Sequence, residues 1–450
     1  TTGDFNVAVG MYSLDANTTA DSNTAVGYQS LTTNTTGHSN VAMGTNAMNG
    51  NTTGNFNTGI GFQTLANNAT GSNNAGLGYN ALVNNTTGGN NTASGYQSLA
   101  TNTTGAENTA VGLNSLYSNT TGSSNVAVGR SALEANTTGG DNVAIGELTM
   151  ENNTTGVRNT GVGTNALFTG TTGDDNVAIG NAALYALTTA SDNTAVGSDA
   201  GKALTTGTGN TALGYSALAF EDTHSNNTAI GWSALKNLNA GAEGNNTAVG
   251  YDAGRNMGIG TQNTLVGKSA GTAITTATWT TAVGTGAGAA ITTGTQNTFI
   301  GGGAGDATTT GASNTSIGYA SLGSNTTASN NTGLGYAALA ANTTGSENTA
   351  VGRNALDANT TGANLVAMGN GALGANTTAS YNTGIGEQAL AANTTGAANV
   401  ALGSYALDAN TTASDNTAIG ASSLTTNTTG ANNVAVGRDA LGANTTANDN

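Results

Sequence analysis

The chain has 450 residues and a formal net charge of −16, from 24 Asp and Glu against 8 Lys and Arg. Because eight basic residues are too few to form a basic patch, nucleic acid is not an expected partner. The chain has no Cys, which excludes disulfides and thiolate metal sites. It has no run of 18 apolar residues and no Pro, and the latter suits a fold whose backbone N–H groups are bonded to neighbouring strands.

A 17-residue repeat runs through the whole sequence. The same short motif recurs 26 times at a spacing of 17 residues, except for one spacing of 19 that ends at Gly250. The first four glycines that close the motif are Gly10, Gly27, Gly44 and Gly61. A fixed short period predicts a stacked array in which each repeat packs on the next.

Each repeat is numbered here from the residue that begins the motif, so that Asn23 to Gly27 occupy positions 1 to 5. The consensus is N-[T/V]-A-[V/I]-G-x-x-[A/S]-L-x-x-N-T-T-[G/A]-x-x. Positions 2 and 4 alternate with small residues at positions 3 and 5, which is the period-two pattern of a strand. We expect one strand at positions 2 to 5, a second at about 7 to 10, and a turn at Asn-Thr-Thr-Gly. The predicted fold class is all-β, a parallel β-solenoid or β-roll of about 26 stacked coils.

Five variant repeats have Gly instead of Leu or Met at position 9. A compensating change elsewhere in these repeats indicates which positions face the core. The five repeats contain Gly201, Gly254, Gly271, Gly288 and Gly305. In the first four, position 12 becomes apolar, as Leu204, Met257, Ile274 and Ile291. One bulky side chain thus changes place within a fixed volume, so positions 9 and 12 are expected to share a core of Val, Ile and Leu.

Asn at positions 1 and 12 is expected to form ladders, in which each amide donates to one copy and accepts from another. The predicted ladder residues are Asn23, Asn40 and Asn57 at position 1, and Asn17, Asn34 and Asn51 at position 12. The Asn-Thr-Thr stretches also match the N-glycosylation pattern, for which Asn226, Asn245 and Asn330, beside the turn, are better candidates. The repeat glycine at position 5 has two interpretations, a backbone conformation that only Gly tolerates or the close approach of another backbone.

The repeat predicts one continuous array over residues 1–450, with regular coils at 1–197 and 312–450 and variant coils at 198–311. The two extra residues are placed in a bulged loop at Lys236–Asn245 that leaves the rung count unbroken. Both ends cut through a repeat, so we expect the array to be part of a longer polypeptide. Because one narrow coil buries little apolar area, association of sister chains is expected, through a flat Ala/Gly face at positions 3 and 5.

Residues with catalytic or metal-binding chemistry are few. His38 and His224 lie in turns of different coils, without an expected partner at catalytic or metal-ligand spacing. The carboxylates Glu107, Asp192 and the pair Asp174–Asp175 fall on turns and are interpreted as solvating charges, with weak calcium binding at the Asp pair as the alternative. No catalysis, resident metal or cofactor is expected.

The motif resembles two families of repeats. Asn125–Gly129 (Asn-Val-Ala-Val-Gly) and Asn176–Gly180 (Asn-Val-Ala-Ile-Gly) resemble the head repeats of trimeric autotransporter adhesins. Asn297–Gly301 (Asn-Thr-Phe-Ile-Gly), followed by Ala304-Gly305, is similar to repeat arrays in bacteriophage tail fibres. The adhesin resemblance implies left-handed parallel β-rolls with three chains side by side on a bacterial surface.

These observations favour the structural shaft of an extracellular fibre, at a cell or virion surface, built as a homotrimer or filament. A host-surface or glycan receptor would be bound by a tip outside this segment, and no direct membrane insertion is expected. One alternative is an ice-binding solenoid that uses the Thr rows at positions 13 and 14. Another is a glycan-binding solenoid that uses aromatic residues at position 6, which include Tyr28, Tyr79, Tyr96, Tyr215 and Tyr251.

Overall fold

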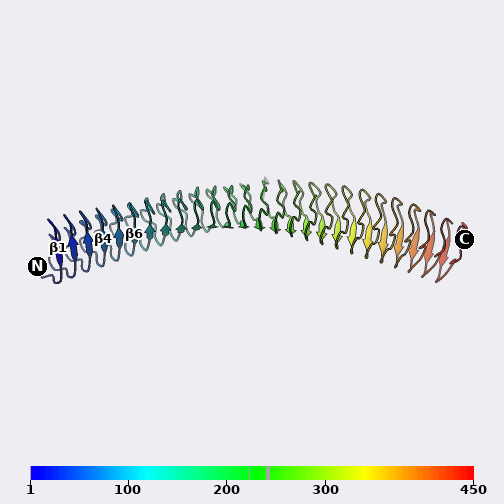
Figure 1. The fold of residues 1–450 in the computed structure, drawn as a ribbon, viewed down its shortest axis with the longest axis horizontal. Coiled ribbons are helices and arrows are strands. Elements are labelled where there is room, and N and C mark those ends of the chain that lie inside the picture. The colour runs from blue at the N-terminus through cyan, green and yellow to red at the C-terminus, as the bar shows by residue number, and fades with distance from the viewer. Residues whose placement is uncertain (1, 222, 240–243) are drawn as a thin grey trace. The chain divides into compact units, whose positions relative to one another are not determined.

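A computed structural model describes residues 2–221, 223–239 and 244–450. Its contacts divide the chain into two compact units, Thr1–Ser225 and Asn226–Asn450. Each unit is a parallel β-solenoid (Figure 1), which confirms the predicted all-β class. The described ranges contain no helix, and hence none that could span a membrane. A single array over 1–450 stays a prediction.

Every strand has three residues, which occupy positions 2 to 4 of a coil. The first unit contains β1 (Val7–Val9), β2 (Thr24–Val26), β3 (Val41–Met43), β4 (Thr58–Ile60), β5 (Ala75–Leu77), β6 (Thr92–Ser94), β7 (Thr109–Val111), β8 (Val126–Val128), β9 (Val143–Ile145), β10 (Thr160–Val162), β11 (Val177–Ile179), β12 (Thr194–Val196) and β13 (Thr211–Leu213). The second unit contains β14 (Thr228–Ile230), β15 (Thr247–Val249), β16 (Thr264–Val266), β17 (Thr281–Val283), β18 (Thr298–Ile300), β19 (Thr315–Ile317), β20 (Thr332–Leu334), β21 (Thr349–Val351), β22 (Val366–Met368), β23 (Thr383–Ile385), β24 (Val400–Leu402), β25 (Thr417–Ile419) and β26 (Val434–Val436).

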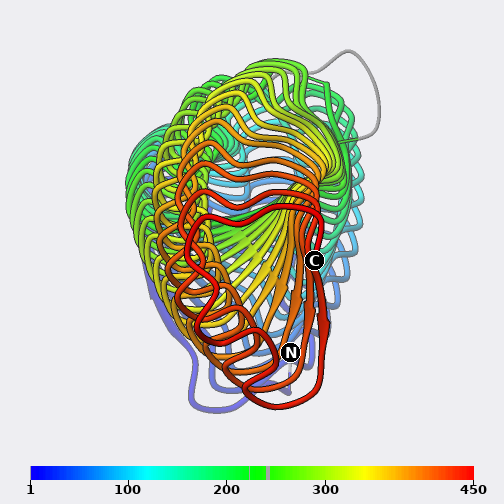
Figure 2. The same ribbon diagram turned by 90° about the vertical axis from the view of Figure 1, so that its right-hand side faces the viewer.

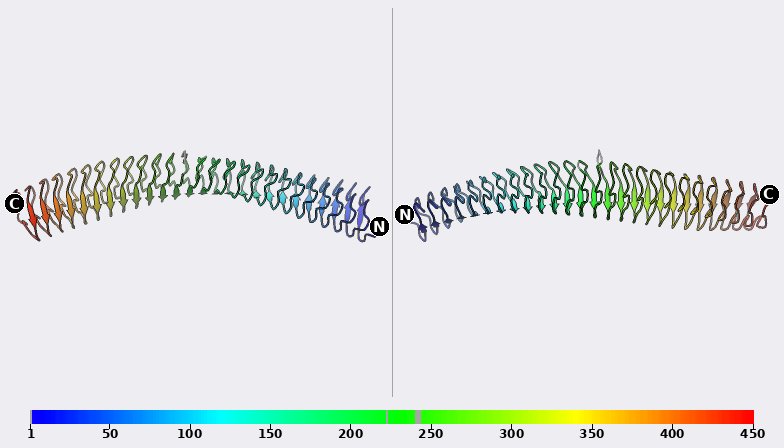
Figure 3. Two further views of the ribbon diagram at one scale, coloured as in Figure 1. Left: turned by 180° about the vertical axis from the view of Figure 1, so that it is seen from behind. Right: turned by 45° about the horizontal axis from the view of Figure 1, so that its top comes forward.

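Within each unit, consecutive strands pair in parallel at the same register. Thr24 of β2 is paired with Val41 of β3, one repeat later. The N–H of Thr24 donates to the carbonyl of Asn40, 2.8 Å away. Because the offset equals the repeat, each position stacks on its own copies, and Figure 3 shows neighbouring strands side by side.

The predicted second strand is wrong. Positions 7 and 9 have positive φ, for example 56° at Gln29 and 50° at Leu31, and a left-handed residue interrupts extended backbone. These turns are still bonded to the next coil, since the N–H of Leu31 donates to the carbonyl of Ala47 at 3.0 Å. Figure 2, which looks along the stack, shows strands on one side of the coils and turns around the rest.

The 19-residue coil keeps its neighbours in phase. Thr228 of β14 is paired with Thr247 of β15, which confirms that the rung count is unbroken. The N–H of Asn239 donates to the carbonyl of Gly258, and the N–H of Gln262 donates to the carbonyl of Gly244, both at 2.9 Å. The same two bonds join regular coils, for example from Thr35 to Thr52 and from Ser39 to Asp21. The middle of the predicted Lys236–Asn245 loop, residues 240–243, lies outside the described residues.

The core is filled by smaller side chains than predicted, and the opposite face of the strand points inward. In nearly every strand the middle residue, at position 3, is buried and the two flanking residues are not, as in Thr24–Val26. Ala25 at position 3, Ala47 at position 8 and Leu31 at position 9 are all fully buried. The predicted core is therefore wrong for the Val and Ile side chains of position 4, which point outward. The predicted Ala/Gly association face is wrong as well, because a strand places alternate residues on opposite sides and position 3 is interior.

The variant coils confirm that positions 9 and 12 share the interior. A Cβ atom on Gly271 would lie 2.8 Å from Cδ1 of Ile274, so the side chain at position 12 fills the space of a Leu at position 9. Gly305 lies in the one variant coil without an apolar residue at position 12. There the ring of Phe299, from position 3 of the same coil, lies 2.6 Å from where that Cβ would be. The exception thus obeys the same conservation of volume.

This interpretation predicts that Phe299 and Gly305 are energetically coupled. Gly305→Leu forces a clash with the Phe299 ring, and Phe299→Ala leaves a cavity worth about 3–5 kcal/mol. The double variant F299A/G305L restores the usual Ala and Leu pair and is expected to be more stable than either single variant. Denaturant unfolding measures this, and losses that simply add would contradict it.

Candidate functional site

Each coil is closed by two amides that share one carbonyl. The carbonyl of Gly37, at position 15, accepts a hydrogen bond from Nδ2 of Asn23 at 2.9 Å and from Nδ2 of Asn34 at 2.8 Å. Oδ1 of Asn23 accepts from the backbone N–H of Asn40 in the next coil at 2.9 Å. Position 1 therefore both closes its own coil and bonds it to the next, and nearly every coil with both Asn residues repeats this arrangement.

Position 12 forms a ladder between side chains. Nδ2 of Asn51 donates to Oδ1 of Asn34 at 2.8 Å, and Asn68 donates in the same way to Asn51. Of the predicted ladder residues, Asn23, Asn40, Asn57, Asn34 and Asn51 are fully buried and make these bonds. The side chain of Asn17 donates only to the carbonyl of Ala20, and its Oδ1 accepts no hydrogen bond, so it does not join the ladder.

The burial of the ladders separates two groups of glycosylation motifs. Asn34 and Asn51 are inaccessible in the folded coil. Asn226, Asn245 and Asn330 are exposed at position 17 and are therefore accessible, as is Asn90 of the Asn90-Asn91-Thr92 motif.

The repeat glycines are required by backbone conformation. Gly10, Gly27, Gly44 and Gly61 have φ between 130° and 137°, which L side chains rarely adopt. A Cβ on Gly27 would lie 2.5 Å from the carbonyl oxygen of Gly44 in the next coil. The close backbone approach considered from the sequence is therefore made by the chain itself.

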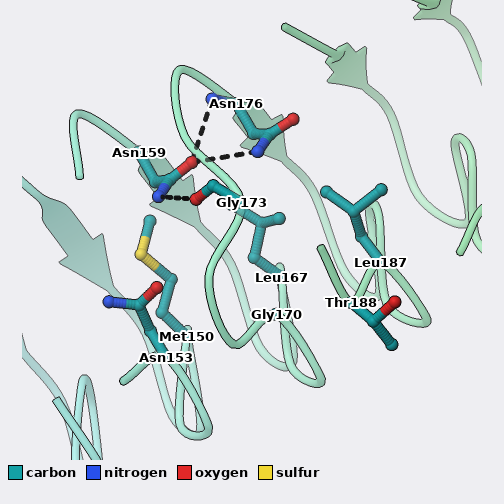
Figure 4. A pocket seen from close by; sticks show the side chains of 9 residues that line it. All are labelled: Met150, Asn153, Asn159, Leu167, Gly170, Gly173, Asn176, Leu187 and Thr188. Carbon is teal, nitrogen blue, oxygen red and sulfur yellow. Dashed lines mark hydrogen bonds between the residues drawn. The ribbon is translucent and has the colours of Figure 1, made fainter. Parts of the chain in front are cut away.

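The position-12 ladder of the first unit stops at Gly170, where a small cavity opens (Figure 4). Figure 4 shows Asn153 on one side of Gly170 and Leu187 on the other, with Met150 and Leu167 beside them. The cavity has a volume of about 10 Å³, roughly what one water needs. A Cβ on Gly170 would meet no atom closer than 3.4 Å, so it would not clash.

Gly170→Asn is therefore expected to raise the free energy of unfolding by about 1 kcal/mol. The new amide would fill the cavity and donate to Oδ1 of Asn153. Gly173→Ala, in the same coil, is expected to lower the free energy of unfolding, because its Cβ would lie 2.1 Å from the carbonyl oxygen of Ala190. Denaturant unfolding of both variants tests this, and a destabilised G170N would show that the ladder geometry does not extend to this coil.

The side chains of positions 2 and 4, called the strand face below, form an uncharged outer surface. None of the 26 strands contains Asp, Glu, Lys or Arg. Position 4 supplies a row of half-exposed apolar residues that includes Leu77, Leu213, Leu334 and Leu402, each between 43 and 53% exposed. Position 2 adds Thr and Val on the same side. Sequence reasoning missed this face, although the small residue at position 3 was the sign of a narrow interior.

Many of the position-6 aromatic residues stack on their own copies. Tyr79 lies between Phe62 and Tyr96, with ring centroids 5.2 and 5.1 Å away and nearly parallel planes. Both faces of Tyr79 are therefore covered and cannot support a sugar ring. Tyr28 meets Tyr12 edge-on at 6.2 Å. Tyr215, at position 6 in the first unit, and Tyr251, at position 6 in the second, are also exposed.

The Thr row at position 13 is also engaged within the fold. Oγ1 of Thr35 donates to the carbonyl of Thr52 at 3.1 Å, and Thr86 does the same to Thr103 at 2.9 Å. These hydroxyl protons are already used, so the row is a poor template for ordered water.

The acidic pair at Asp174–Asp175 is engaged by neighbouring coils. Asp175 accepts two hydrogen bonds from Arg158, at 2.6 and 2.7 Å, and this bonding lowers the pKa of Asp175. Oδ1 of Asp174 accepts from the N–H of Val157. Glu107 and Asp192 are exposed. Within the described ranges, no three Asp, Glu or His side chains are grouped as metal ligands.

The two histidines have different surroundings. His38 lies at the surface with its ring edge-on to Phe56, 4.8 Å between centroids. His224 is buried and contacts Glu221, three residues before it, a partner that was not considered from the sequence. Glu221 and His224 occupy positions 12 and 15, and Oε1 of Glu221 accepts from the N–H of His224 at 2.9 Å. The pair thus replaces the Asn-to-carbonyl bond of other coils.

No known protein-family model matches the sequence, and no curated protein is similar to it. The fold is therefore established by the structure alone.

Proposed function

We propose that the chain is the structural shaft of an extracellular fibre, in which copies of the chain associate through the strand face. One observation carries the proposal, namely the uncharged, half-exposed row of apolar side chains at position 4 through the strands of each unit. Soluble monomers rarely expose continuous apolar patches larger than a few hundred Å². A second copy offers the same chemistry at the same spacing.

The interior of the coil supports association. Each regular coil buries mainly two small residues and one Leu or Met, so apolar burial within a single chain is modest. Packing of the strand faces adds the Val, Ile and Leu side chains of position 4. The resemblance to trimeric adhesin heads makes three chains the expected number, with the receptor bound by a tip beyond this segment.

The setting proposed for the shaft is a cell or virion surface. Amide ladders, backbone bonds and small core residues serve length and stiffness. They offer no catalytic group, so we propose no enzymatic activity and no cofactor.

The mass of the particle in solution tests the proposal. Light scattering after size exclusion is expected to give the mass of three chains, and electron micrographs are expected to show filaments. The mass of one chain would contradict the shaft as proposed here.

Charges placed on the strand face are expected to separate the chains. In I145K/I179K, two lysines enter the apolar row of the first unit, and the cost of burying them is expected to shift the particle toward single chains. T138K/T172K is the matched control, because it adds the same charges at the same spacing on exposed threonines of position 14. Equal masses for the two variants would show that the strand face is not the interface.

Ice binding by the strand face is a second candidate, favoured by the register of the position-2 threonines. Thr315, Thr332 and Thr349 stack directly on one another in the sheet. Such a row repeats hydroxyl and methyl groups at about 4.8 Å. Thermal hysteresis is the expected signature, and its absence in the wild-type protein would exclude this candidate.

A further inference from the structure

The aromatic row of the second unit has one ring missing. Position 6 is occupied in successive coils by Thr285, Gly302, Tyr319 and Tyr336. The Tyr319 and Tyr336 rings stack with centroids 5.7 Å apart and planes 15° from parallel. Gly302, in the coil before Tyr319, has no side chain to cover the opposite side of that ring.

The missing side chain leaves a depression with a volume of about 330 Å³. Its lining residues are Thr285, Gly302, Gly303, Asp306, Tyr319 and Ala320. Tyr319 is 62% exposed, against 44% for Tyr79, whose two faces are both covered. The difference is the free ring surface that faces the depression. Two coil spacings, about 9.6 Å, separate the level of Tyr319 from that of Thr285, which is enough for one ring to enter between them.

A carboxylate lies beside this ring. Oδ2 of Asp306 is 3.7 Å from the position of a Cβ on Gly303, so the group lies at the glycine floor of the depression. The next coil has Gly323 at the equivalent position, which leaves the carboxylate uncovered on that side. Partial burial raises the pKa of Asp306, against the opposing effect of its bonds to backbone N–H groups. The site therefore combines an apolar ring face with hydrogen-bond acceptors.

We propose that this depression binds one pyranose ring of a neutral glycan. The C–H face of the sugar would pack on Tyr319 in place of the missing ring, and its hydroxyl groups would donate to Asp306. The carboxylate and the net charge of −16 disfavour acidic sugars. The volume is at the lower end of small-ligand pockets. The site lies on positions 6, 7 and 10, apart from the strand face, and does not depend on chain association.

Affinity electrophoresis of the full chain through gels that contain dextran, laminarin or galactomannan tests the proposal. Retardation by at least one of these neutral polysaccharides is expected. Tyr319→Ala removes the ring wall and is expected to weaken binding at least tenfold. Gly302→Tyr is expected to abolish it by completing the aromatic row, and its Cβ has room, with no contact below 3.4 Å.

Tyr79→Ala is the matched control, because it removes a tyrosine of the same row whose faces are covered, and it is expected to leave retardation unchanged. No retardation by any of the three polysaccharides would overturn the proposal, as would equal losses in Y319A and Y79A or full binding by G302Y. Light scattering of each variant separates this result from the shaft proposal, since a single-chain mass would contradict the shaft and leave the sugar site to be judged by retardation alone.

Discussion

The regular coils depend on a carbonyl group at position 15 that is held by two asparagine amides; in the coils of Gly170 and Leu204 the position-1 amide alone remains. In the coil of Asn23, this carbonyl belongs to Gly37, and the amides of Asn23, 14 residues away, and Asn34, 3 residues away, both donate to it. The bonds are buried, so their loss would leave polar groups without partners in a low-dielectric interior. They close a coil that has too few apolar residues to close by hydrophobic burial alone.

The remaining architecture follows from this closure. A coil held so tightly has room for Ala at position 3 and Leu at position 9, as Ala25 and Leu31 show. Because strand residues alternate, Thr, Val and Ile at positions 2 and 4 are turned outward. The same geometry that fills the narrow interior thus creates the uncharged strand face on which the proposed association of chains rests. At position 6, just beyond the strand, the row of side chains is interrupted at Gly302, and this gap leaves a depression in the surface.

The period of the sequence was sufficient to predict the fold class, the coil length and the amide ladders, since identical residues in identical environments must stack. Which face of the strand points into the core could not be derived from alternation alone, because a period of two is unchanged when the two faces are exchanged. The turn at positions 7 to 10 was mistaken for a strand because left-handed Leu residues such as Leu31 are unusual outside this coil. Gly302 and Gly303 marked the depression in the sequence, but their neighbours across coils became visible only in the structure.

The most direct test of the account is amide hydrogen exchange after removal of one position-1 amide. In Asn108→Ala, the N–H of Asn125 loses its acceptor and the carbonyl of Gly122 loses one of its two donors. Exchange at Asn125 and in the adjoining β8 strand is then expected to accelerate by roughly tenfold or more. Thr104→Ala, at an exposed position of the preceding coil, should leave exchange unchanged. Equal exchange in the two variants would contradict the claim that the shared carbonyl holds the coil closed.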